Sequence, residues 1–129
     1  MIFRYDAKQR PMLPVSLCKQ ESSVNVEALV DSGADVNVLP WSIGIELGLV
    51  WNPNKATLRL AGVSAGAAAM PVLVEATIGS LRPVTLAFAW CESDAVPLVL
   101  GQTNFFMEFD ICFFRSRLEL SVVPKAGRT

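Results

Sequence analysis

Three observations predict that this chain folds as an all-β domain, closed or barrel-like. Short apolar segments alternate with turn residues about every ten positions, a pattern typical of all-β barrels and sandwiches. The 129 residues suffice for one domain with its own core. With 52% apolar and 18% charged residues, the chain also has more apolar side chains than the core of a small domain needs, so an apolar self-association surface is expected. We expect a single domain over 1–129, with a core at about 10–122 and a mobile polar tail at 124–129.

Alternation and turn residues define the elements of the first half. Val24, Val26 and Ala28 share one face of a strand that follows the polar stretch KQESS. Residues 41–49 suit a short helix, and Gly48 is the expected stop at its carboxyl end. Extended segments are predicted at 13–18, 24–30 and 36–40, with a turn at 31–35.

The second half reads as two hairpins separated by shorter elements. Residues 56–79 predict a long hairpin with Gly62 and Gly66 near its bend, and 103–109 suit a single helical turn. Further strands are predicted at 80–90, 96–101, 109–114 and 117–123. An apolar strand precedes a short helix twice in the chain, which suggests a pseudo-symmetric half-barrel.

Charge and residue usage exclude several function classes. The formal net charge is -1, from 11 basic and 12 acidic residues, so the chain lacks the electrostatic footprint of a nucleic-acid binder. The absence of histidine removes the commonest transition-metal ligand and the usual base of Ser-His and Cys-His catalysis. Any catalysis must therefore use carboxylates, lysines, thiols or hydroxyls.

Cysteine usage and the amino-terminal residues indicate a compartment. Cys18, Cys91 and Cys112 form no Cys-x-x-Cys pair, and their odd number argues against a disulfide framework or a zinc site. They read as small buried apolar residues in a reducing compartment. The stretch MIFRYDAKQRPM has no signal-peptide pattern, and no apolar run reaches about 18 residues. We expect a cytoplasmic protein with no membrane partner.

The stretch EALVDSGADVNVLP, from Glu27 to Pro40, contains the strongest candidate for chemistry. Asp31 directly follows an apolar strand, where desolvating a carboxylate is costly unless the charge is paired or neutralised. Asp, Ser and Gly are all turn formers, so one explanation is an ordinary surface turn. The other explanation is a catalytic carboxylate.

This stretch resembles the active-site segment of the retropepsin-like aspartic proteases, in which an apolar strand precedes Asp-Thr/Ser-Gly-Ala-Asp. The glycine-containing hairpin at 57–74 stands where that family has its flap, and VPLVLGQTNFF resembles the second family signature. RPMLPVSL is similar to the amino-terminal segment, so the resemblance covers about 10–122. It implies a closed barrel equivalent to half of a pepsin-type fold, with one or two short helices and a flap hairpin.

The resemblance also implies a reaction. Peptide hydrolysis without a metal or a covalent nucleophile needs water between two carboxylates that share one proton at about 3 Å. The chain has one Asp-Ser-Gly, so the resemblance implies a homodimer that supplies Asp31 twice. Ser32 matches a position that bonds across the dimer axis, and Gly33 lets its amide approach the carboxylate. No cofactor or metal is expected.

Further site residues follow by position in the family pattern. Ala34 and Asp35 are expected to bind substrate, together with the flap-tip residues Gly62, Val63, Ser64, Ala65 and Gly66. Leu100 and Gly101 are expected to support the aspartate loop. The family commonly pairs the residue at the Asp35 position with an arginine directly after the second-signature glycine, where this chain has Gln102. Arg10 resembles an arginine that reaches the partner subunit.

The expected function is thus an aspartic endopeptidase acting on peptides or proteins, with a preference for bulky apolar residues beside the cut. Two alternatives remain open. The first is a catalytically silent dimer of the same fold that binds peptides or proteins; Gln102 and the alanine-rich flap favour it. The second is an unrelated small β-barrel in which Asp31 only makes a turn.

Overall fold

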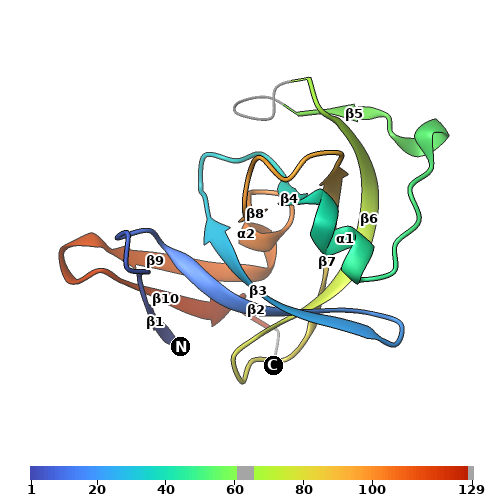
Figure 1. Ribbon diagram of the computed structural model, residues 1–129. Coiled ribbons are helices and arrows are strands. Elements are labelled where there is room, and N and C mark those ends of the chain that lie inside the picture. Colours follow the sequence, from blue (N-terminus) through green and yellow to red (C-terminus); the bar gives the residue numbers. More distant parts are fainter. Residues whose placement is uncertain (61–65, 128–129) are drawn as a thin grey trace.

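The computed structural model describes residues 1–60 and 66–127 and is built mainly from short strands (Figure 1). The strands are β1 (Ile2–Arg4), β2 (Met12–Lys19), β3 (Ser22–Val30), β4 (Asn37–Leu39), β5 (Leu58–Arg59), β6 (Ala68–Ile78), β7 (Val84–Cys91), β8 (Leu98–Leu100), β9 (Phe109–Phe114) and β10 (Glu119–Pro124). The helices are α1 (Trp41–Glu46) and α2 (Phe105–Glu108), with single 3-10 turns at Pro53–Lys55 and Arg115–Arg117.

Six of these strands close a barrel. They are hydrogen-bonded in the order β2-β3-β8-β4-β7-β6, and β6 returns to β2 through four residue pairs, from Val15–Ile78 to Cys18–Glu75. The short strand β5 adds to the outer end of β6. Closure removes the unpaired edges that an open sheet of these strands would expose. The prediction of an all-β, closed architecture with one or two short helices is confirmed.

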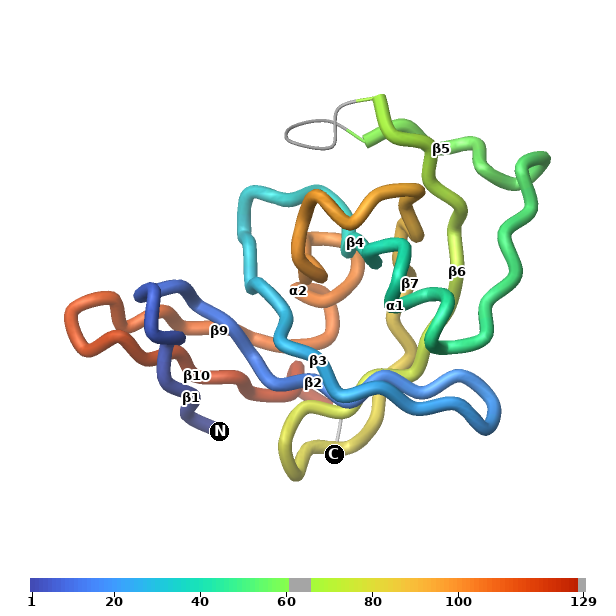
Figure 2. Tube along the Cα trace, viewed as in Figure 1, coloured from blue at the N-terminus to red at the C-terminus, as the bar shows by residue number. Residues whose placement is uncertain are grey.

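A separate three-stranded sheet, in the order β1-β10-β9, lies beside the barrel. Figure 2 shows the blue amino-terminal segment running alongside the red carboxy-terminal hairpin. Phe3 pairs with Leu120, which is fully buried, so β1 packs apolar surface against the core. The sequence pattern did not predict β1, because three residues are too few to show an alternation. After β10, the Lys125 amide donates to the Glu108 carbonyl at 3.0 Å.

Alternation explains which face of each barrel strand is buried. On β2 the side chains of Leu13, Val15 and Leu17 are buried, while Pro14 is exposed. On β3 the residues from Val24 to Val30 alternate between more buried and exposed positions, as predicted. The period of two therefore places one apolar set inside the barrel and a more polar set outside.

Helix α1 closes one side of the barrel by packing on Trp90. The Trp90 indole is fully buried and stacks on Trp41 at 5.0 Å between ring centroids, and Trp51 meets Trp90 edge-on at 5.3 Å. A Cβ on Gly44 would overlap the Trp90 ring, so only glycine fits there. Gly48 follows the helix with φ +77°, which confirms the predicted stop.

Asn37 is the one buried polar residue among those described, and it joins the barrel strands. Its Nδ2 donates to the Ala87 carbonyl at 2.9 Å and to Asn104 Oδ1 at 3.2 Å. Its Oδ1 accepts the Gly101 amide at 2.8 Å. The network is completed by the Ala87 amide, which donates to Asn104 Oδ1 at 2.9 Å. A buried network of this kind is stabilising because its donors and acceptors are paired.

We expect Gly44→Ala to lower the free energy of unfolding by about 1–3 kcal/mol, because the added methyl group overpacks the site against Trp90. Urea unfolding followed by tryptophan fluorescence measures the change. The matched control is Ile45→Ala on the same helix, where the side chain is 50% exposed, and its expected effect is below about 0.5 kcal/mol. Equal effects of the two variants would contradict this packing.

We expect Asn37→Ala to lower the free energy of unfolding by about 1–3 kcal/mol for each buried polar group that it leaves unpaired. The Gly101 amide is the first of these groups. Asn25→Ala is the control, since Asn25 is exposed on β3. Hydrogen exchange should show faster exchange at the Gly101 amide in Asn37→Ala alone. Unchanged protection there would show that Asn37 does not hold this loop.

Candidate active site

The candidate site forms where two parallel strands end side by side. Strand β3 pairs with β8 in the register Ala28–Leu98, Leu29–Val99 and Val30–Leu100. The next residues along the two strands are Asp31 and Gly101, and each begins a loop. We refer to residues 31–36 as the aspartate loop and to 101–104 as the supporting loop. Parallel pairing thus brings two segments about 70 residues apart in sequence to the same edge of the barrel.

Asp31 is held in place by its own loop and by β8. Its amide donates to the Leu100 carbonyl at 3.0 Å, and its Oδ1 accepts the Gly33 amide at 2.9 Å. A Cβ on Gly33 would lie 3.3 Å from Oδ1, closer than ordinary contact, so glycine keeps this approach open. The turn expected from Asp-Ser-Gly is therefore present. It leaves Oδ2 without a protein partner among residues 1–60 and 66–127.

The supporting loop braces the aspartate loop through backbone bonds. The Gln102 amide donates to the Ala34 carbonyl at 2.8 Å, and the Thr103 amide donates to the Asp35 carbonyl at 2.9 Å. A Cβ on Gly101 would lie 2.7 Å from the Ala34 oxygen and 2.5 Å from the Val36 oxygen. Glycine is therefore required at 101, and Leu100 before it is fully buried. Both residues lie where a supporting role was predicted.

The Gln102 side chain has a different partner from the one that the family pattern suggested. Its Nε2 donates to the Ser32 carbonyl at 2.8 Å, so it adds a third brace across the two loops. It makes no contact with the Asp35 carboxylate. Ser32 itself is exposed at the tip of the aspartate loop, next to Gly33. Gln102 thus stabilises the loop and does not compensate the Asp35 carboxylate.

Arg10 is paired within its own chain. It lies on the turn between β1 and β2, where its guanidinium contacts Asp6 Oδ2 at 2.8 and 2.9 Å. The Asp6 Oδ1 accepts the Arg10 amide at 2.8 Å, and this bond is the main cause that lowers the pKa of the Asp6 carboxyl. The turn adjoins the aspartate loop, because the Val30 amide donates to the Pro11 carbonyl. Contact between Arg10 and a partner subunit stays a prediction.

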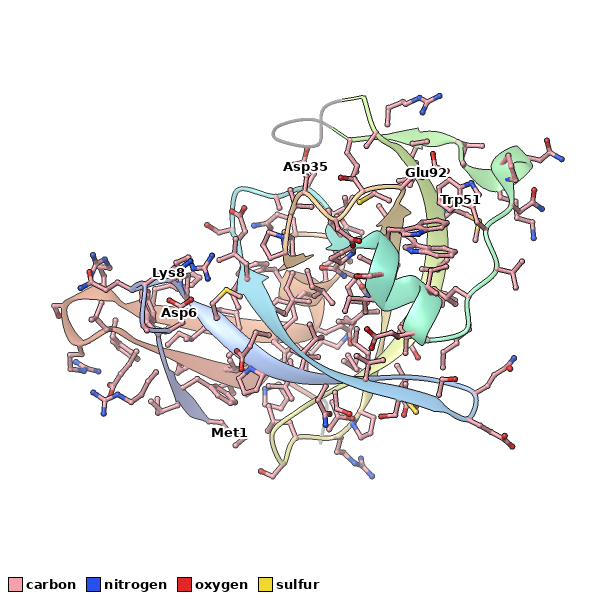
Figure 3. All side chains as sticks on the ribbon, viewed as in Figure 1. Met1, Asp6, Lys8, Asp35, Trp51 and Glu92 are labelled. Carbon is pink, nitrogen blue, oxygen red and sulfur yellow. The ribbon has the colours of Figure 1, made fainter. Side chains whose placement is uncertain are left out.

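Asp35 is exposed on the aspartate loop (Figure 3). In that view its side chain points away from the barrel, while Asp6 and Lys8 lie on the turn between β1 and β2. Within the described part of the chain, no donor or cation contacts the Asp35 carboxylate. Ala34 is half-buried beside it. The site thus presents one carboxylate held by an amide and a second that makes no side-chain contact with the described residues.

The predicted flap is described only at its base. β5 and β6 pair through Leu58–Ala69 and Arg59–Ala68, which confirms a hairpin here. Gly66 has φ +79°, and its amide donates to the Leu60 carbonyl at 2.8 Å. The other predicted tip residues lie outside the described residues: Gly62, Val63, Ser64 and Ala65.

Two supporting residues were missed by the sequence analysis. Asn37 and Asn104 connect the supporting loop to β4 and β7 through the buried network described above. The available signal was a polar residue inside the apolar segment VNVLP. A polar side chain in a buried strand requires partners, and that requirement marks a specific role.

The described residues contain neither a cluster of metal ligands nor a membrane-spanning helix. Over 1–60 and 66–127, no three acidic, cysteine or histidine side chains gather as a metal site would require. None of the described helices has the length and apolarity to cross a bilayer. The three cysteines are free, but only Cys91 is buried; Cys18 is half-buried and Cys112 is exposed, so the prediction of three buried cysteines is wrong. Burial raises the pKa of the Cys91 thiol.

Comparison with known proteins identifies similar folds but no similar sequence. No protein-family model and no curated protein matches this chain. A retropepsin-like aspartic protease from Rickettsia conorii aligns with a TM-score of 0.71 and 16% identity, covering 93% of this chain and 95% of that one. The retroviral protease-like domain of Ddi1 from Leishmania major aligns with a TM-score of 0.58 and 18% identity, covering 91% and 98%.

A third similar structure is the EIAV protease complexed with the inhibitor HBY-793. It aligns with a TM-score of 0.57 and 19% identity, covering 78% of this chain and 88% of that one. All three similarities extend over most of both chains, and all three proteins are proteases or protease-like domains by name. The predicted retropepsin-like fold is confirmed: this chain has the fold of the retropepsin-like aspartic proteases.

Proposed function

We propose that this chain is an aspartic endopeptidase that hydrolyses peptide bonds with water activated by Asp31 from each of two subunits. The observation that carries the proposal is the placement of Asp31. It follows Val30, the buried last residue of β3; it is oriented by the Gly33 amide at 2.9 Å, and its loop is braced by the supporting loop. The fold it shares with aspartic proteases supports the same reaction.

The reaction requires a second copy of the chain. One carboxylate cannot act as base and acid in the same step, and the chain offers one Asp-Ser-Gly. A two-fold axis beside the aspartate loops would place the two Asp31 side chains together. Strand β9 supports this association, because it has one neighbour in the three-stranded sheet and leaves its other edge unpaired among the described strands. Phe113 on β9 is 37% exposed.

In this mechanism the two Asp31 carboxylates share one proton. The ionised carboxylate takes a proton from the bound water as the water oxygen attacks the substrate carbonyl carbon, and the protonated one gives its proton to the carbonyl oxygen. The carboxyl that took the water proton then gives it to the amide nitrogen, while the other carboxylate takes a proton from a hydroxyl of the tetrahedral intermediate. The C–N bond breaks, the acid and amine products leave, and the pair again shares one proton. Ser32 would link the loops across the axis, and Gly33 would keep its amide on the carboxylate.

The substrate would lie in extended form over the aspartate loops, where Ala34 and Asp35 contact it. The hairpin residues Gly62, Val63, Ser64, Ala65 and Gly66 would cover it and exclude water. We propose a peptide or protein substrate with bulky apolar residues beside the cut. The three free thiols fit a reducing, cytoplasmic compartment. No cofactor takes part.

A catalytically silent dimer that binds peptides is the second candidate. The observation that favours it is the Asp35 carboxylate, which has no charged partner among the described residues and is therefore free to bind a ligand. This candidate needs the same fold and the same dimer but no proton transfer. Cleavage assays separate the two functions.

We expect Asp31→Asn to lower kcat/KM for peptide cleavage by at least about 100-fold, because an amide can neither accept the water proton nor return it. The measurement uses a mixed peptide library at pH 4 to 7, with products identified by mass spectrometry. The specific activity of the wild-type protein should rise with protein concentration over the range in which sedimentation shows dimer formation.

Glu21→Gln is the control, since it removes one exposed carboxylate from the turn between β2 and β3. It should leave cleavage unchanged. Cleavage that persists in Asp31→Asn would rule out the proposed mechanism. A sedimenting dimer that binds library peptides but does not cleave them would support the silent binding module.

A further inference from the structure

We propose that Asp35 selects peptides carrying a lysine or arginine within about four residues of the cut bond. This inference rests on the proposed function, because it assigns a substrate class to the same site. The observation behind it is an exposed carboxylate on the aspartate loop, four residues after Asp31, that is not neutralised by the described part of its own chain.

The backbone of Asp35 is firmly held although its side chain is free. Its carbonyl accepts the Thr103 amide at 2.9 Å, and the preceding carbonyl of Ala34 accepts the Gln102 amide at 2.8 Å. The following residue, Val36, forms a parallel bridge with Thr103. The backbone beneath this carboxylate is therefore already ordered, so binding a ligand cation costs only the rotamer freedom of the Asp35 side chain.

Two donors that could neutralise Asp35 are used elsewhere, and a third does not contact it. The guanidinium of Arg10 is bound to Asp6 at 2.8 Å. The Gln102 side-chain amide is bound to the Ser32 carbonyl at 2.8 Å. Arg59, on β5 at the base of the hairpin, does not contact Asp35 either. Within residues 1–60 and 66–127, no cation therefore neutralises the charge that Asp35 presents on the aspartate loop.

The spacing along the chain limits which substrate residue the charge can reach. Asp35 follows Asp31 by four residues, so their Cα atoms are at most about 14 Å apart, and the intervening turn shortens this. An extended peptide advances about 3.4 Å per residue. The cation therefore belongs within about four residues of the cut. In a two-fold dimer one Asp35 serves each side of the cut.

The expected preference is moderate, because the pair is solvent-exposed. One exposed ion pair corresponds to about a 2–5-fold change in kcat/KM. Screening should weaken the preference as salt rises, since the Debye length falls from about 30 Å at 0.01 M to about 10 Å at 0.1 M. An apolar contact with the lysine stem would not show this dependence.

The experiment compares three peptides that differ at one position three residues from the cut, occupied by lysine, norleucine or glutamate. For each, kcat/KM is measured at low and at physiological salt with the wild-type protein, Asp35→Asn and Asp35→Lys. The readout is kcat/KM for the lysine peptide divided by kcat/KM for the norleucine peptide. A general loss of activity in a variant lowers both values alike and therefore does not affect this ratio. Circular dichroism checks that each variant is folded.

Glu21→Gln is the matched control. It changes the net charge by the same amount as Asp35→Asn but lies before the first residue of β3, at the opposite end of that strand from the aspartate loop. We expect a lysine preference of about 2–5-fold in wild type and in Glu21→Gln at low salt. The preference should disappear in Asp35→Asn and shift towards the glutamate peptide in Asp35→Lys.

Equal ratios in wild type and Asp35→Asn would overturn the inference while leaving the proposed protease intact. If no peptide is cut, the same ratios are measured as binding constants of fluorescein-labelled peptides. A lysine preference in binding that is lost in Asp35→Asn would support the inference and contradict the protease. Peptides that are neither cut nor bound with a charge preference would overturn it.

Discussion

The braces between the aspartate loop and the supporting loop are the constraint on which the rest of the site depends. Glycine at 101 lets the two backbones approach until the Ala34 carbonyl meets the Gln102 amide at 2.8 Å, and Asn37 fixes the Gly101 amide from inside the barrel. Without that approach, β3 and β8 could still pair, but the loops beyond them would have no common position. The direction of Asp31 therefore depends on a buried asparagine and a glycine.

The charged side chains around the two loops differ in whether they are paired. Arg10 and Asp6 neutralise each other on the neighbouring turn, and Gln102 donates to a backbone carbonyl. Asp31 and Asp35 thus remain the charged groups of the aspartate loop, with the first oriented by an amide and the second free of contacts among described residues. Such an arrangement suits a site whose remaining interactions come from outside the chain, namely a second subunit and a substrate.

The features of the fold that were predicted correctly correspond to strong, repeated patterns in the sequence. The alternation in β2 and β3 and the glycine after α1 reflect local rules that act within a few residues, and the structure follows them. β1 was not predicted, because a three-residue strand shows no period. Its place depends on pairing with β10, about 117 residues later, which no local pattern reports.

The sequence by itself predicted an all-β closed fold and the turn at Asp31, because these follow from side-chain periodicity and from the turn preferences of Asp, Ser and Gly. The need for glycine at 101 came from the tertiary structure, which brings the Ala34 and Val36 carbonyls of another loop against it. Only the tertiary structure decided the partners of Asn37, Gln102 and Arg10. Each of these polar side chains has several possible partners in a linear sequence. Which one it meets depends on strand register and barrel closure, and these are set by the packing of the whole core.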